Sequence, residues 1–219
     1  MKKKILLGLS GSVACSKSEL FVNKYSENYD FKILSTFNGL KYLSKKFLNT
    51  HSVYSDWDDL PGSPHIELAR WADEFVIYPA SANVISKIST GIADDLLTST
   101  VLMYSKPIYI CPAMHEEMFL NTQISSNLTS LSKYHFIAGP RYGNLDIGDK
   151  GLGRLIEPNE LNDWINKSKG KIICLLDADD YFNPNKLSVL KKNFDQKNHI
   201  NTIFDLQIGR AHVRTPVTA

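Results

Sequence analysis

FVIYPASANVISKISTGIADDLLTSTV, residues 75–101, is the stretch that decides the fold of this chain. It opens with four apolar residues, 75–78, which are typical of a strand buried on both faces of a sheet. Pro79 is expected to stop this strand. The small residues that follow are then predicted to form a loop with free hydroxyl and amide groups. These residues are Pro79, Ala80, Ser81, Ala82 and Asn83.

Two helices are expected after that loop. Apolar residues recur at helical spacing until Gly91, which can close the first helix. Either Asp94 or Asp95 starts the second helix, over residues 96–102. A strand that leads through small polar residues into a helix N-terminus presents backbone N–H groups and the positive end of the helix dipole. The stretch therefore predicts an anion-binding turn.

A second turn of this kind follows the first apolar segment. Residues 4–9 are expected to form a central strand that leads into a turn of glycines and hydroxyl residues. Glycine permits close backbone approach and positive φ, and serine hydroxyls can donate to a phosphate. A plain tight turn is the alternative reading. The residues concerned are Gly8, Ser10, Gly11 and Ser12.

Five apolar segments alternate with helical patterns over residues 1–168. The predicted strands cover residues 4–9, 31–35, 75–78, 107–111 and 135–138. This alternation predicts an α/β fold of the Rossmann-like, flavodoxin-like kind, in which a parallel sheet has helices on both faces. Thr36, or Ser35 if the register slips, ends the second strand and could either contact a phosphate or cap the helix expected over residues 39–47. In such sheets ligands bind at the carboxyl edge.

His65 begins a short helix, within PHIELARWAD at residues 64–73. A histidine at a helix N-terminus is favoured in its neutral form and can act as a base. An ordinary surface position is the alternative.

Met114, His115 and Met118 follow the predicted strand at residues 107–111, in the segment PAMHEEMF. Methionine often only fills a core. The position just past a strand end favours a loop over a site instead, and histidine can donate a hydrogen bond to a carboxylate.

Taken in order, these segments resemble the flavin-dependent cysteine decarboxylases, a family that includes phosphopantothenoylcysteine decarboxylase and the peptidyl-cysteine decarboxylases of lantibiotic synthesis. The resemblance implies that FMN is the cofactor and that His65 is the catalytic base. It also implies that Met114, His115 and Met118 bind the substrate carboxylate. The cofactor-binding residues that it implies are Gly8, Ser10, Gly11, Ser12, Thr36, Pro79, Ala80, Ser81, Ala82, Asn83, Asp94 and Asp95.

The chain departs from the family pattern at three positions. His115 stands where asparagine is typical, and Phe119 where tryptophan is typical. Ile147 lies in a glycine-rich segment, residues 143–154, which is expected to be a mobile flap. Ile147 aligns with a cysteine that supplies a proton in the coenzyme A pathway enzymes, and an isoleucine cannot supply one.

Three functions therefore compete. The first is FMN-dependent decarboxylation of 4′-phosphopantothenoylcysteine, in which the thiol-bearing carbon is oxidised before CO2 leaves. The second is oxidative decarboxylation of a peptidyl-cysteine or another thiol acid, which Ile147 favours. The third is a non-catalytic flavin-binding regulatory subunit. The resemblance also implies a homotrimer or a higher assembly of trimers.

The composition predicts a cytoplasmic protein, and the family resemblance implies a small-molecule thiol carboxylate as its substrate. A net charge of +2, with acids and bases interspersed, gives no nucleic-acid surface, and no apolar run is long enough for a membrane span. The three cysteines lie far apart and fit a reducing compartment. Lysines before an apolar run resemble an export signal, but serines and a glycine interrupt that run early. The acids of residues 56–59 are interpreted as solvated, so no metal is expected.

The sequence changes character near residue 168. Residues 1–168 are predicted to form the FMN-binding domain. Residues 169–207, with an Asp-Ala-Asp turn, resemble a fragment of a family-2 glycosyltransferase, although an extra strand and helix of the main domain is the alternative. Residues 208–219 follow no periodic pattern and are predicted to be a disordered tail and a sequencing artefact.

Overall fold

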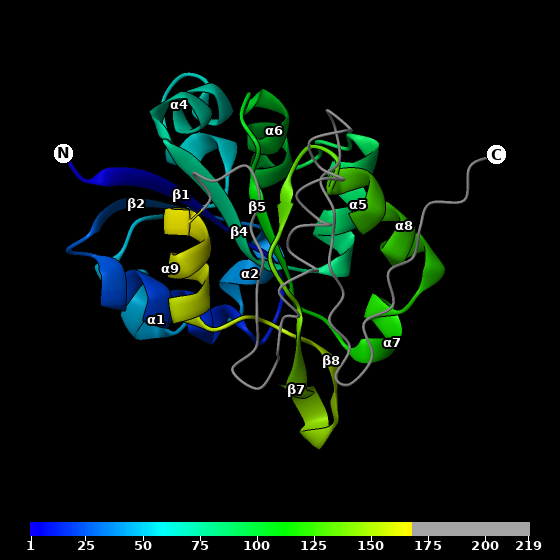
Figure 1. Ribbon diagram of the computed structural model, residues 1–219. Helices are drawn as coiled ribbons and strands as arrows, with labels where there is room; N and C mark the ends of the chain where they lie inside the picture. The colour runs from blue at the N-terminus through cyan, green and yellow to red at the C-terminus, as the bar shows by residue number, and fades with distance from the viewer. Residues whose placement is uncertain (168–219) are drawn as a thin grey trace.

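A computed structural model describes residues 1–167 of the chain (Figure 1). Its centre is a six-stranded, fully parallel sheet with the order β3-β2-β1-β4-β5-β6. The strands are β1 (Lys3–Leu9), β2 (Tyr29–Ser35), β3 (Val53–Tyr54), β4 (Glu74–Ala80), β5 (Tyr109–Pro112) and β6 (Phe136–Ile137). The predicted α/β fold with a flavodoxin-like parallel sheet is confirmed.

Helices cover both faces of the sheet. One face carries α1 (Cys15–Tyr25), α3 (Lys45–Thr50) and α9 (Pro158–Lys167). The other carries α4 (Pro64–Trp71), α5 (Ala82–Thr90), α6 (Leu96–Met103) and α8 (Thr122–Leu131). The short helices α2 (Phe37–Leu40) and α7 (Glu116–Phe119) follow β2 and β5. None of the helices within residues 1–167 is long and apolar enough to cross a membrane.

The central strands are apolar throughout because both of their faces are buried. In β1, Ile5 and Leu7 pack against α1 and α9, whereas Leu6 between them packs against α4 and α6. Val76 and Tyr78 of β4 belong to the first core, and Phe75 and Ile77 belong to the second. This alternation follows from the two-residue period of a strand.

A two-stranded antiparallel hairpin extends beyond the sheet. It consists of β7 (Arg141–Asn144), the 3-10 turn η2 (Asp146–Gly148) and β8 (Lys150–Arg154). Figure 1 shows this hairpin beside α7, at the end of the molecule opposite α4. The glycine-rich segment that was predicted as a mobile flap forms most of this hairpin.

Three details of the sequence prediction are corrected. Pro79 does not stop its strand, since β4 continues to Ala80. A proline lacks an N–H but keeps its carbonyl, which accepts hydrogen bonds from Ser10. The helix expected over residues 39–47 is two short helices, because the Ser44 side chain caps the second one. The polar region after residue 52 contributes the edge strand β3, which two residues are too few to reveal by periodicity.

Candidate functional site at the carboxyl edge of the sheet

The turns after β1, β2 and β4 are joined by hydrogen bonds. The Ser10 hydroxyl donates to the carbonyl oxygen of Pro79 over 2.9 Å and accepts from the Ser81 amide over 2.7 Å. The Thr36 amide donates to the carbonyl oxygen of Leu9 over 2.9 Å. Ser10 is fully buried. Its hydroxyl proton is committed to the protein, so in this structure Ser10 joins two turns and does not face a ligand.

Three other hydroxyl groups on these turns form a partly exposed set, which we call the hydroxyl rim: Ser12, Thr36 and Ser81. Each accepts a backbone N–H bond, from Ala14 over 3.3 Å, Gly39 over 3.1 Å and Val84 over 3.5 Å respectively. No residue in the described part of the chain accepts their own protons. All three side chains are half-buried. They can therefore donate to an anion.

The alternative register, with Ser35 in the site, is disfavoured. The Ser35 side chain is buried and its hydroxyl donates to the carbonyl oxygen of Thr36 over 2.9 Å. Thr36 is thus the residue at the end of β2 whose proton stays available.

The two predicted glycines of the first turn have different surroundings. A Cβ on Gly8 would meet Leu97 and Phe75 at 3.2 Å, so Gly8 lets the sheet pack closely against α6. A Cβ on Gly11 would lie 3.0 Å from the Cβ of Asn38, so Gly11 lets the first two turns approach each other. Gly11 is the one placed beside the hydroxyl rim.

The expected loop after β4 is shorter than predicted. Pro79 and Ala80 belong to β4, Ser81 caps α5, and Ala82 and Asn83 lie in the first turn of that helix. Since Ser81 is an N-cap, the N-terminus of a nine-residue helix opens beside the rim. Its dipole favours a negative ligand. Gly91 closes the helix with a φ of 73°, as predicted.

Asp94 and Asp95 order the junction of α5 and α6. Lys87 Nζ lies 2.6 Å from an Asp94 oxygen and 3.3 Å from an Asp95 oxygen. The hydrogen bond from Lys87 lowers the pKa of Asp94. Asp95 is the residue that caps α6, through a reciprocal pair of bonds with Thr98. Among residues 1–167 no hydrogen bond joins either acid to the hydroxyl rim, so their predicted contact with a cofactor stays a prediction.

His65 lies in the first turn of α4, as predicted. Its Nδ1 atom is buried and has no hydrogen-bond partner among the described residues. The edge of its ring meets the ring of Trp57, with centroids 5.2 Å apart and planes at 71°. An imidazole nitrogen without a partner is available for proton transfer. No local pattern in the sequence marks Trp57, because it stands among the acidic residues of a loop.

His115 occupies the N-cap position of α7, and its ring is hydrogen-bonded to two carboxylates. Its Nδ1 bonds Glu117, and its Nε2 lies 3.0 Å from an oxygen of Asp149, at the tip of the hairpin. The hydrogen bond to Glu117, followed by the bond to Asp149, raises the pKa of His115. Met118 is 49% exposed beside it, whereas Met114 packs partly against the second core.

The hairpin is fixed at its base to the same turn. The Met114 amide donates to the carbonyl oxygen of Gly153 over 3.1 Å, and the Leu152 amide donates to a Glu116 oxygen over 2.7 Å. A Cβ on Gly153 would collide with the Met114 carbonyl, so glycine is needed there. Glu116 and Asp149 were not predicted, because the contact joins segments more than thirty residues apart.

The two predicted functional histidines are separated. No contact among the described residues joins His65 to Met114, His115 or Met118. Figure 1 places α4 and α7 at opposite ends of the molecule. One chain alone therefore does not bring the predicted base to the predicted carboxylate site.

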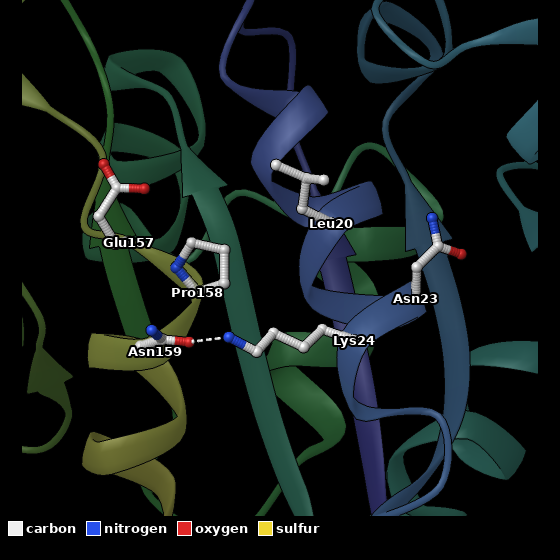
Figure 2. A pocket seen from close by; sticks show the side chains of 6 residues that line it. All are labelled: Leu20, Asn23, Lys24, Glu157, Pro158 and Asn159. Carbon is white, nitrogen blue, oxygen red and sulfur yellow. Dashed lines mark hydrogen bonds between the residues drawn. The ribbon is translucent and has the colours of Figure 1, made fainter.

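A groove between α1 and α9 lies outside this region (Figure 2). Lys24 crosses it and donates to the Asn159 side chain over 2.6 Å. None of the predicted site residues lines it.

Comparison with known proteins agrees with this architecture. The Flavoprotein family model matches residues 1–170. The coenzyme A biosynthesis bifunctional protein CoaBC of Vibrio cholerae is 35% identical over 167 residues, which cover 73% of this chain and 42% of that protein. The chain thus spans less than half the length of this relative.

Two solved structures are similar. A mutant PPC decarboxylase complexed with pantothenoylaminoethenethiol is 32% identical, with a TM-score of 0.72 over 77% of this chain and 99% of that one. The FMN-dependent cysteine decarboxylase SpaF is 28% identical, with a TM-score of 0.60 over 69% and 89% of the two chains.

A second model, glycosyl transferase family 2, matches residues 159–214. The predicted glycosyltransferase-like fragment, residues 169–207, and the predicted tail, residues 208–219, lie outside the described residues. For residues 1–167 the resemblance to flavin-dependent cysteine decarboxylases is confirmed. Since the first family model spans most of the sequence, the chain belongs to the flavoprotein family.

Proposed function

We propose that the chain binds FMN at the hydroxyl rim. The observation that carries this proposal is the set of three hydroxyl protons, on Ser12, Thr36 and Ser81, that the described residues leave without an acceptor. They stand beside the N-terminus of α5, and a phosphate is the anion that such an arrangement suits. The residues present therefore fit the phosphate end of FMN.

The proposed activity is FMN-dependent decarboxylation of a cysteine-containing substrate, 4′-phosphopantothenoylcysteine. Bound FMN would supply the two-electron oxidation at the thiol-bearing carbon. His65 would take up the substrate proton, which its unpartnered Nδ1 allows. His115 and Met118 would position the carboxylate next to the reacting carbon.

The site is proposed to be complete only in a homotrimer or a higher assembly of trimers. Figure 1 places α4, which carries His65, and α7, which begins after His115, at opposite ends of the molecule, so the base of one copy would serve the carboxylate site of another. Two buried free cysteines, Cys15 and Cys111, accord with the proposed cytoplasmic location. Residues 1–168 are proposed as the flavoprotein unit, and residues 169–207 as a glycosyltransferase-like fragment followed by an artefactual tail.

The experiment is a titration followed by product analysis. Purified protein should be yellow or should take up added FMN. With 4′-phosphopantothenoylcysteine it should release CO2, and His65→Asn should lose this activity by at least about a hundredfold while keeping its flavin spectrum. A colourless protein that ignores FMN would refute the proposal.

A second candidate is oxidative decarboxylation of a peptidyl-cysteine or another thiol acid. Ile147 favours it, because this side chain stands at the tip of the hairpin, is 86% exposed and carries no proton to donate. The product mass separates the two activities. A saturated thiol from 4′-phosphopantothenoylcysteine supports the first, and a product two hydrogens lighter supports the second. A regulatory subunit would release no CO2 and would retain its effect on a partner in His65→Asn.

A further inference from the structure

The imidazole of His115 has no nitrogen left for a ligand. Glu117 occupies Nδ1 and Asp149 occupies Nε2. An imidazole ring has only these two hydrogen-bonding atoms. A substrate carboxylate can therefore reach His115 only if one of the two acids leaves.

The two acids differ in how they are held. Glu117 belongs to α7, the helix that His115 caps, so it moves with the ring. Asp149 belongs to the tip of the hairpin, and its side chain is 55% exposed. The bonds that fix the hairpin to α7 and to the turn before it come from Leu152 and Gly153, nearer its base. Asp149 can thus leave while the base of the hairpin stays attached.

Among the described residues, no other charged group takes the place of Glu117 or Asp149 at the His115 ring. Glu116, next to the ring in sequence, turns to the amide of Leu152. Within residues 1–167, the groups that shift the titration of His115 are Glu117 and Asp149 alone. Both favour the charged form of the ring, which is the form that binds a substrate carboxylate once Asp149 has left.

We propose that Asp149 is an internal substitute for the substrate carboxylate, which occupies Nε2 of His115 until a thiol acid displaces it. This inference deepens the proposed function and rests on the assignment of His115 to the carboxylate site. Asp149 then acts as a specificity-determining residue. A ligand without a carboxylate cannot replace it, so only acids free the hairpin tip.

The test compares Asp149→Asn with Asp146→Asn. Both variants remove one negative charge from the hairpin tip, but the Asp146 carboxylate accepts from the Ile147 amide and does not contact His115. The ring resonances of His115 are followed by NMR. In ligand-free protein, Asp149→Asn should lower the pKa of His115, and Asp146→Asn should leave it nearly unchanged.

The ligands are N-acetyl-L-cysteine and N-acetylcysteamine, which differ only in the carboxylate. Removing the internal competitor should tighten binding of N-acetyl-L-cysteine to Asp149→Asn by about tenfold, the equivalent of one charge-assisted hydrogen bond. Binding of N-acetylcysteamine should not change. Equal affinities of wild type and Asp149→Asn for the acid, or an unchanged titration of His115, would overturn the inference.

This experiment uses neither FMN nor turnover. If the protein proves colourless and releases no CO2, the proposed function fails. The His115 measurements still decide whether Asp149 occupies a carboxylate-binding site.

Discussion

The hydroxyl rim lies on turns that follow strands of the parallel sheet. The bonds of His115 to Glu117 and Asp149, which we call the hairpin contact, join such a turn to the separate two-stranded hairpin, and different forces hold the two regions. The rim is built from backbone amides and hydroxyl groups around the fully buried Ser10. The hairpin contact is built from two carboxylates that are largely open to solvent and one imidazole that is partly exposed. Neutral buried bonds depend little on pH or salt, whereas exposed ion pairs depend on both.

The difference teaches which part of the site is preorganised. A cofactor that stays bound needs a fixed phosphate site, and under the proposed function the rim would be such a site, already held in place before any ligand arrives. A substrate that enters and leaves needs a site that can open. The exposed contact between His115 and Asp149 is weak enough to exchange for a ligand.

Glycine substitutions should show the largest difference in stability and FMN binding between the hydroxyl rim and the hairpin. A Cβ on Gly39 would collide with the Ser35 hydroxyl and lie 3.0 Å from the carbonyl oxygen of Leu9, both of which are fixed. Gly39→Ala should lower the free energy of unfolding by about 2 kcal/mol and weaken FMN binding. Chemical denaturation and FMN titration measure the two effects.

The matched control is Gly143→Ala in the hairpin. There the added Cβ meets the side chain of Arg154, which is flexible and can move aside. Stability and FMN binding should both stay close to wild type. A loss as large as that of Gly39→Ala would mean that the hairpin is as rigid as the rim.

Serine substitutions should separate the structural role of Ser10 from the proposed binding role of the hydroxyl rim. Ser10→Ala leaves the Ser81 amide without its acceptor and should cost about 1.5 kcal/mol of unfolding free energy. Ser12→Ala removes a partly exposed hydroxyl, so it should weaken FMN binding with little change in stability. The same two measurements apply. Equal stability of the two variants would contradict the structural role of Ser10.

Much of this rim could be predicted from the sequence, because its signals are local. The apolar runs, the small polar residues after them and Gly91 identify strands, turns and a helix end by short-range rules. The rules failed where a long-range contact decides the outcome. Pro79 stays in its strand because Ser10, from another strand end, bonds its carbonyl.

The hairpin contact could not be predicted from local patterns. His115 was recognised as a departure from the family pattern, but its partner Asp149 lies 34 residues away in an apparently loose glycine-rich segment. Similarly, no local pattern marks Trp57 among the acidic residues of its loop. Its contact with His65 depends on where the first turn of α4 lies relative to that loop. Chemistry that depends on tertiary pairs leaves no periodic signal in the sequence.

Raising the pH should loosen the hairpin and leave the rim intact. The pKa of His115 is raised in the folded protein, first by Glu117 and then by Asp149. A raised pKa means that the ion pairs stabilise the fold fully below the unfolded pKa of histidine, and that this contribution is lost as pH rises through the folded value. Tryptic cleavage at Lys150, relative to an unfolded peptide of the same sequence, should therefore accelerate between about pH 6 and pH 9.

In His115→Asn the rate ratio should not depend on pH, because asparagine does not titrate. FMN affinity of the wild type should stay level between about pH 7 and pH 9, where the flavin phosphate is already fully charged. A pH-independent cleavage ratio in the wild type would show that the imidazole does not hold the hairpin.

The smallest effect is expected at the junction of α5 and α6, which tests whether Asp94 belongs to the rim at all. Its carboxylate is exposed and paired with Lys87, and exposed pairs contribute little to stability. Asp94→Asn should therefore change the FMN dissociation constant by less than about a factor of two. Asp95→Ala is the control, because it removes the side-chain cap of α6 and should lower the melting temperature without a direct effect on FMN. A large loss of FMN affinity in Asp94→Asn alone would move this acid into the cofactor site and extend the rim beyond its neutral hydroxyl groups.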